Sequence, residues 1–91
     1  MFDRQFFGDT FPERVREFAA QQSVRSVKVN VVTRDGQPHN IQAIHSGEDG
    51  VRLVTVDGAM VFLPYHEISR VEVSAPEGEK GPLGFQVPAS P

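Results

Sequence analysis

Cysteine is absent from this chain of 91 residues, and so is any long apolar run. Without cysteine there can be no disulfide framework and no thiolate metal site, and nothing indicates an oxidising compartment. No stretch is apolar enough over a sufficient length to span a bilayer. The first eight residues carry acidic as well as basic side chains, unlike a signal peptide. These absences favour a soluble protein of the cytoplasm.

An excess of basic side chains is also missing. Lysine and arginine together number 9 against 12 for aspartate and glutamate, and the pI is about 5.5. The segment 24–74 has five basic and six acidic side chains and is close to neutral. Because the surface of a nucleic-acid-binding domain is usually basic, the composition argues against a generic nucleic-acid binder. Only a local basic patch would attract phosphate.

The length fits one domain near the lower end of the size that supports a hydrophobic core. No disulfide or thiolate-bound metal compensates for so small a core. Oligomerisation is therefore expected to contribute to its stability.

The strongest structural signals lie between residues 51 and 73, VRLVTVDGAMVFLPYHEISRVEV. Asp57-Gly58 joins two apolar runs and predicts a hairpin, because both residues tolerate the positive φ of a two-residue turn. Pro64 has no backbone N–H, so the strand 59–63 ends there or lies on an edge. Residues 64–67 leave room for one tight turn before β-branched residues resume at Ile68. Such a corner is typical of small closed barrels.

A helix is predicted over residues 11–21. Thr10 is the expected N-cap, Pro12 fits the first turn, and Glu13 completes a capping box with Thr10. The apolar positions share one face, which we expect to lie across an open end of the barrel. They are Phe11, Val15, Phe18 and Ala19.

Two further strands precede the central stretch. Residues 24–34 alternate as a strand with one buried face, Asp35-Gly36 supplies a second hairpin turn, and residues 37–46 return, with Pro38 indicating an edge. The chain therefore has five predicted strands behind one helix. Tight links between the strands favour a small barrel or sandwich over an α/β unit.

The two ends of the chain differ in composition from the middle. Residues 1–9 form an arm rich in phenylalanine, which either packs on the barrel or a neighbouring subunit or serves as a docking motif. Residues 75–91 are rich in proline and glycine and are predicted to be a flexible tail, in which GPLGFQVP is a possible linear ligand. The domain proper is expected over residues 10–74, with the barrel over 24–74.

No catalytic set of residues can be identified, and no cofactor or metal is implied. Ser46 and Ser69 have no evident His/Asp partners, and no nucleophile-elbow or phosphate-loop pattern is present. His39, His45 and His66 lack the i, i+4 spacing of a helical metal pair. The alternative is a three-histidine site that assembles in space within one chain or around a ring axis. Tyr65 and His66, at the corner, either offer a ring and an imidazole to an RNA base and phosphate, or pack and cap the corner itself.

From Val27 to Val73 the chain resembles the Sm-like proteins, and among them most closely the bacterial Hfq type. Residues 27–32 followed by Asp35-Gly36 are similar to the family's apolar strand that ends in a turn glycine. Residues 41–46, Asp49 and residues 51–54 continue the resemblance. Residues 66–71, HEISRV, are similar to the histidine, small residue, isoleucine, serine, threonine, valine run of Hfq.

This resemblance implies an all-β fold, in which an N-terminal α-helix precedes a five-stranded, strongly bent antiparallel Sm-like (SH3-like) barrel. Subunits of this family pair through their fourth and fifth strands, here near 59–64 and 68–74, into a closed homo-oligomeric ring of about five to seven copies. The implied function is non-catalytic binding of single-stranded RNA. Tyr65 and His66 would line the pore side, and phosphate contacts would come from Lys28, Arg52 and Arg70.

Two departures from the Hfq pattern affect the implied RNA site. Pro64 and Tyr65 stand where a tyrosine and a lysine precede the histidine in Hfq, so a lysine near the pore is missing. Residues 46–50 contain no aromatic side chain, although the family has one in this loop. Base stacking and positive charge are therefore both reduced at the usual site.

A second resemblance leads to another class of function. Leu63 to Ile68, LPYHEI, is similar to the segment with which PRC-barrel modules close a small β-barrel that binds protein partners. Such a module would have no nucleic-acid ligand and would be monomeric or dimeric. An accessory subunit of an enzyme, with no ligand of its own, is a third possibility.

Overall fold

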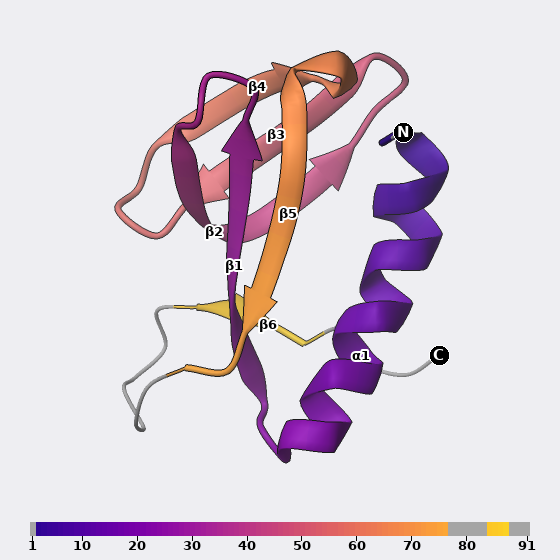
Figure 1. Cartoon of the computed structure of the whole chain (residues 1–91), viewed down its shortest axis with the longest axis vertical. Helices are drawn as coiled ribbons and strands as arrows, with labels where there is room; N and C mark the ends of the chain where they lie inside the picture. The colour runs from indigo at the N-terminus through magenta and orange to yellow at the C-terminus, as the bar shows by residue number, and fades with distance from the viewer. Residues whose placement is uncertain (1, 77–83, 88–91) are drawn as a thin grey trace.

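The computed structural model describes residues 2–76 and 84–87, which form an N-terminal helix followed by a six-stranded antiparallel sheet (Figure 1). The expected all-β class with an N-terminal helix and a bent sheet is confirmed. The elements are η1 (Phe6–Thr10), α1 (Phe11–Gln22), β1 (Ser26–Thr33), β2 (Pro38–Ser46), β3 (Gly50–Thr55), β4 (Met60–Pro64), η2 (Tyr65–Glu67), β5 (Ile68–Ser74) and β6 (Phe85–Gln86).

The helix begins earlier than predicted. Thr10 is not an N-cap, because its backbone is helical, with φ −68° and ψ −47°, and its side chain makes no capping hydrogen bond. A π-helical turn, η1, runs directly into α1. The cap is Asp3, whose carboxylate accepts the backbone N–H of Phe6 at 2.8 Å. The predicted arm is thus helical from Arg4 on, because the packing of its phenylalanines and the Asp3 cap both favour an added turn.

The sheet order is β4-β3-β2-β1-β5, and β6 pairs with β1. Figure 1 shows η1 and α1 running alongside the sheet. Alternation along β1 points Val27, Val29 and Val31 to the inner face, where each is at most 1% exposed. These side chains form one core with those of the helix and of the neighbouring strands. The buried members include Phe7, Phe11, Val15, Ala19, Ile41, Val51, Leu53, Ile68 and Phe85.

The two Asp-Gly turns have the same construction, and it differs from the predicted two-residue turn. In the first, the N–H of Gly36 donates to the Thr33 carbonyl and the N–H of Thr33 donates to the Gln37 carbonyl. This is a three-residue loop in which glycine alone has a positive φ, +89° at Gly36 and +95° at Gly58. Aspartate is needed for its carboxylate, which accepts a hydrogen bond from the hydroxyl of Thr33 or Thr55.

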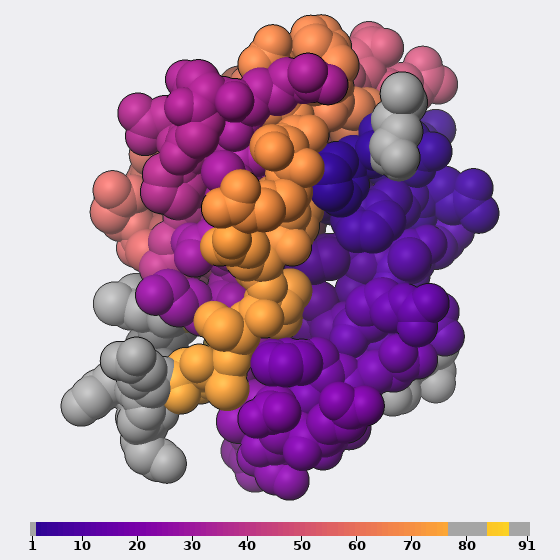
Figure 2. Space-filling view, viewed as in Figure 1, coloured from indigo at the N-terminus to yellow at the C-terminus, as the bar shows by residue number. Residues whose placement is uncertain are grey.

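The sheet does not close into the predicted barrel. Within the described residues β4 pairs only with β3, and β5 only with β1, so that both are free edges. The space between them is filled from the helix: the ring of Phe7 stacks on that of Tyr65 in η2, with centroids 6.0 Å apart. In Figure 2, β5 lies at the surface between the β1–β2 hairpin and the helix. Side-chain packing rather than backbone pairing therefore completes the core.

Part of the predicted flexible tail is a strand. Phe85 and Gln86 pair with Val27 and Ser26 of β1, and Phe85 is only 7% exposed. Burial of an aromatic ring and pairing with β1 offset the weak local propensity of this segment rich in proline and glycine. The rest of the predicted tail, residues 77–83 and 88–91, lies outside the described residues.

Candidate functional site

Tyr65, the first predicted RNA-binding residue, is half-buried and packs on the core. Its ring stacks on Phe7, and its hydroxyl donates to the backbone carbonyl of Gly47. Partial burial raises the pKa of Tyr65 above its ordinary value. A ring with one face on Phe7 and a hydroxyl committed to the 46–50 loop is a structural part of the corner, so it is poorly placed to stack on a base.

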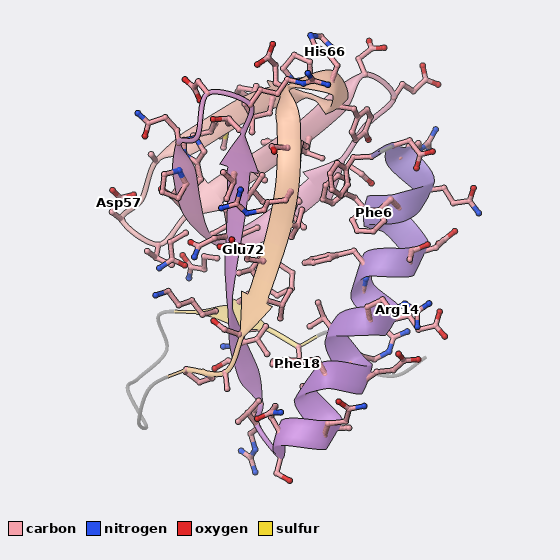
Figure 3. The ribbon with its side chains drawn as sticks, viewed as in Figure 1. Phe6, Arg14, Phe18, Asp57, His66 and Glu72 are labelled. Carbon is pink, nitrogen blue, oxygen red and sulfur yellow. The ribbon has the colours of Figure 1, made fainter. Side chains whose placement is uncertain are left out.

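His66 has the opposite environment. Figure 3 shows it at the corner of the sheet, and its side chain is 74% exposed. Its Nε2 atom lies 3.5 Å from a carboxylate oxygen of Glu67, and its backbone carbonyl accepts Arg34 Nε at 2.6 Å. The imidazole is accessible, but its nearest charged neighbour is acidic. That neighbour opposes the approach of a phosphate.

The predicted basic residues Lys28 and Arg70 share the outer face of the sheet without forming a patch. Lys28 lies opposite Ser74 and Arg70 opposite Val32 in the β1–β5 register. The two positions are four residues apart along the strands, or about 13 Å. Glu72 lies between them and accepts Arg70 Nε at 2.7 Å. The structure therefore does not gather the five predicted RNA-binding residues into one site.

Arg52, the fifth predicted residue, belongs to a different surface. It lies directly opposite His45 of β2 on one side and Phe62 of β4 on the other. Residues opposite each other in antiparallel strands point to the same face, so the three side chains form a row across the outer face of β2, β3 and β4. Phe62 is 71% exposed, and Met60, two positions earlier on β4, is 55% exposed.

An open groove of about 750 Å³ runs beside this row. It is lined by His45, Ser46, Gly47, Asp49, Gly50, Val51, Arg52, Phe62, Leu63 and Pro64. Sequence reasoning identified Arg52 but missed Phe62 and His45 as surface groups. The alternation of Met60 and Phe62 with Val61 and Leu63 does indicate that the two pairs lie on opposite faces of the strand. Because all four side chains are apolar, the alternation does not indicate which face is exposed.

Among residues 2–76 and 84–87, only β3 pairs with β4, so the backbone of β4 has hydrogen-bonding groups beside this row that no strand uses. Thr55 N–H donates to the Ala59 carbonyl at 2.8 Å, and Tyr65 N–H donates to the Asp49 carbonyl at 3.3 Å. Since backbone groups alternate in direction along a strand, Val61 and Leu63 also turn theirs toward β3. Met60 and Phe62 therefore turn their N–H and C=O groups to the free edge.

The same reasoning applies to β5. Thr33 N–H donates to Gln37 on the β2 side, so the odd-numbered residues of β1 face β2 and the even-numbered ones face β5. In the register, Glu72 and Ser74 lie opposite even-numbered residues of β1. Their neighbours Val71 and Val73 consequently turn their backbone groups to the free edge. Both valines have partly buried side chains that pack on the core.

The described residues hold neither a cluster of metal-binding side chains nor a helix that could cross a membrane. Residues 2–76 and 84–87 contain no group of three or more His, Asp or Glu side chains arranged to hold a metal ion, so the predicted alternative of a three-histidine site within one chain is not formed there. In the same part of the chain, no helix has the length and apolar character needed to cross a membrane.

Comparison of this chain with protein-family models, with curated proteins and with solved structures found no match.

Proposed function

We propose that this chain is a non-catalytic subunit that assembles with copies of itself into an Sm-like ring through the free edges of β4 and β5. The observation that carries the proposal is the edge of β4, where Met60 and Phe62 present exposed apolar side chains and backbone groups that pair with no other strand of the described part of the chain. An exposed apolar edge is a template for pairing with another strand. Pairing with another strand would cover the ring of Phe62 and would also supply hydrogen-bond partners for the backbone groups of Met60 and Phe62.

The two edges complement each other residue by residue. In an antiparallel pairing, Phe62 of one copy lies opposite Val71 of the next, and Met60 lies opposite Val73, because all four turn their backbone groups outward. Such pairs exchange two hydrogen bonds each and point their side chains to the same face. On this face the seam is apolar and closes over Val71 and Val73, which are only partly buried in the single chain. On the other face the same register places Val61 opposite Glu72 and Leu63 opposite Arg70.

The geometry of the two edges supports a ring rather than a dimer. β4 and β5 are different surfaces, so their pairing is head-to-tail, and head-to-tail contacts generate closed rings when the rotation between subunits closes. A dimer that joins β4 to β4 would leave both β5 edges free. The ring leaves none, which is the usual way in which small barrels avoid open edges.

The test is the mass in solution by light scattering, with Phe62→Asp as the variant and Arg52→Ala as its control. Both residues lie on the outer face of neighbouring strands, but only Phe62 lies in the seam. We expect one discrete oligomer for the parent chain and for Arg52→Ala, and a monomer for Phe62→Asp. A monomeric parent chain, or an unchanged mass for Phe62→Asp, contradicts assembly through this edge.

Binding of single-stranded RNA is a second candidate function, supported by the row of His45, Arg52 and Phe62. In the single chain, the exposed ring of Phe62 beside a guanidinium and an imidazole combines a stacking surface with phosphate contacts. In the ring, where the seam covers Phe62, only His45 and Arg52 of this row stay available. This row replaces Tyr65 as the stacking group. Lys28, His66 and Arg70 remain secondary candidates, each exposed but remote from this row or beside a carboxylate.

RNA binding is tested by fluorescence anisotropy with short A-rich and U-rich oligonucleotides at two salt concentrations. If Arg52 contacts phosphate, Arg52→Ala lowers the affinity and makes its salt dependence shallower, while the mass stays that of the parent. A discrete ring that ignores RNA would retain the assembly and reject this function. A monomer or dimer without RNA affinity would favour the alternative, a PRC-barrel-like module that binds proteins.

A further inference from the structure

The first residues of β1 lack a partner from β2. β2 pairs with β1 only from Val29 to Val32, and the register of β2 against β3 shifts between Ile41 and Ala43. A bulge of this kind bends a strand away from its neighbour. Ser26 and Val27 are left with an open ladder on the β2 side of β1.

Residues 84–87 fill this open ladder. Phe85 lies opposite Val27, Gln86 lies opposite Ser26, and the N–H of Val87 donates to the Arg25 carbonyl at 3.3 Å. The ring of Phe85 is 7% exposed and meets Phe11 of α1 edge to face, with centroids 5.6 Å apart. The site thus supplies backbone hydrogen bonds and one deep aromatic pocket.

Gly84 completes the fit. A Cβ atom added there would lie 3.4 Å from the Val27 carbonyl oxygen, which is closer than most side chains come to a backbone oxygen. The segment that fits is therefore extended, with a glycine, an aromatic residue, a residue that faces solvent and an apolar residue in that order. The side chain of Gln86 is exposed, so this residue contributes only its backbone to the pairing with β1.

We propose that this site on β1 is a strand-acceptor site for extended peptide segments of the pattern Gly-aromatic-polar-Val from other polypeptides, and that residues 84–87 are its tethered competitor. Addition of a strand to an open ladder, with side-chain pockets that provide specificity, is a general mode of peptide recognition. Here the occupant follows β5 through residues 75–83, and its departure would leave the pairing of the strands β1 to β5 unchanged.

The length of the connection supports exchange. β5 and β6 lie on opposite sides of β1, a separation of about 10 Å, or two strand spacings. The nine residues from 75 to 83 can reach about 30 Å when extended. The connection is thus not the constraint that holds β6 in place. A tether of this length gives an effective concentration of the order of millimolar, so the tethered segment excludes a free peptide present at micromolar concentration.

The experiment measures the binding of a fluorescent synthetic peptide of residues 82–89 to the full chain. We compare the parent chain with Phe85→Ser, which empties the aromatic pocket, and with Val87→Pro, which removes the N–H that donates to Arg25. Circular dichroism shows whether each variant is folded. If Phe85→Ser is unfolded, the comparison rests on Val87→Pro, which keeps the ring of Phe85. The control peptide carries serine in place of Phe85.

We expect the peptide to bind at least one folded variant more than about tenfold tighter than it binds the parent, because the tethered competitor has been weakened. The control peptide should not bind. Equal affinity for the parent and the variants, or no binding to any folded variant, would overturn the proposal. These outcomes do not depend on β4 and β5, so they are separate from the test of ring assembly.

A reversible lock gives an independent test on an otherwise intact chain. Ser26 and Gln86 lie opposite each other between hydrogen-bonded pairs, where Cα atoms are about 4.5 Å apart and a disulfide can form. The chain has no cysteine, so the Ser26→Cys, Gln86→Cys double variant forms one defined bond. Peptide binding that is weaker in the oxidised than in the reduced form supports the proposal, and binding unaffected by oxidation overturns it.

Discussion

Gly50 shows how the absence of a side chain allows β4, the edge strand, to pair closely with β3. A Cβ atom at this position would lie 2.2 Å from the carbonyl oxygen of Leu63 and 2.9 Å from the Cα of Pro64, both of which are backbone atoms of β4. Backbone held in a ladder cannot move aside as the end of a flexible side chain can. Gly50 is therefore required for the close approach of β3 and β4.

We expect Gly50→Ala to lower the free energy of unfolding by about 1–3 kcal/mol, the range for overpacking a well-packed region. Gly47→Ala is the matched control, because its Cβ would meet only the Gly50 carbonyl oxygen at an ordinary 3.5 Å. Chemical denaturation of both variants decides the point. A Gly50→Ala variant as stable as Gly47→Ala would mean that β4 is free to shift.

The threonine and aspartate of each hairpin loop act together. A hydrogen bond from the hydroxyl of Thr55 lowers the pKa of Asp57 below its ordinary value of 3.8. The hydroxyl of Thr33 and the N–H of Gln37 do the same for the pKa of Asp35. The ionised carboxylate is thus the form that the folded loops favour.

A depressed pKa contributes stability that is present above the unfolded value and is lost as pH falls through the lower folded value. We therefore expect the free energy of unfolding to decrease as pH falls below about 4. The loss should be smaller in an Asp35→Asn, Asp57→Asn double variant. Urea denaturation at pH 6 and pH 3 provides the comparison. Equal losses in the two proteins would show that other carboxylates dominate the acid response.

At the scale of elements, the helix illustrates how tertiary contacts extend a local signal. Thr10, Pro12 and Glu13 carry the usual marks of a helix start, yet the chain is already helical before them. The rings of Phe2, Phe6 and Phe7 lie within 6 Å of one another by centroid distance, and Phe7 is 3% exposed. Burial of Phe7 favours the additional turn, and Asp3 caps it.

Asp3→Ala and Thr10→Ala distinguish the two possible caps. We expect Asp3→Ala to cost about 1 kcal/mol, the usual value for the loss of an N-cap hydrogen bond. Thr10→Ala should have little effect, because no capping bond is lost. Thermal unfolding with parallel circular dichroism measures both changes. The reverse order of costs would place the helix start at Thr10 in solution.

At the scale of the whole molecule, the open sheet leaves two edges and one acceptor ladder to be satisfied. The ladder is filled within the chain by β6, whereas β4 and β5 have no partner among the described residues. A fold with a small core and free edges gains stability when a second copy covers them. Folding and assembly should therefore be linked.

Linkage predicts that the melting temperature of the parent chain rises with protein concentration, because association stabilises only the folded state. Phe62→Asp should melt at one temperature at all concentrations, and below the parent. Calorimetry over a hundredfold range of concentration tests this. A parent chain whose melting temperature is independent of concentration would indicate that the single chain is the complete folding unit.

The sequence by itself determined the order of elements. The apolar face of residues 11–19 predicted one helix. Alternation at residues 27–31, the Asp-Gly turns and the Pro64 break predicted five successive strands and a one-turn corner, because these signals act through neighbours along the chain. It did not determine that the turns are three residues long. That depends on threonine hydroxyls, which meet the aspartates only once the loop has formed.

Only the tertiary structure decided which apolar residues are covered and which residues meet. Phe62 and Phe85 are both aromatic residues beside glycine or proline turns, yet one is 71% exposed and the other 7%. The difference arises because β1 has an open ladder and α1 supplies a pocket, whereas β4 lies at the edge. The grouping of His45, Arg52 and Phe62 likewise depends on register across three strands, which no local pattern specifies.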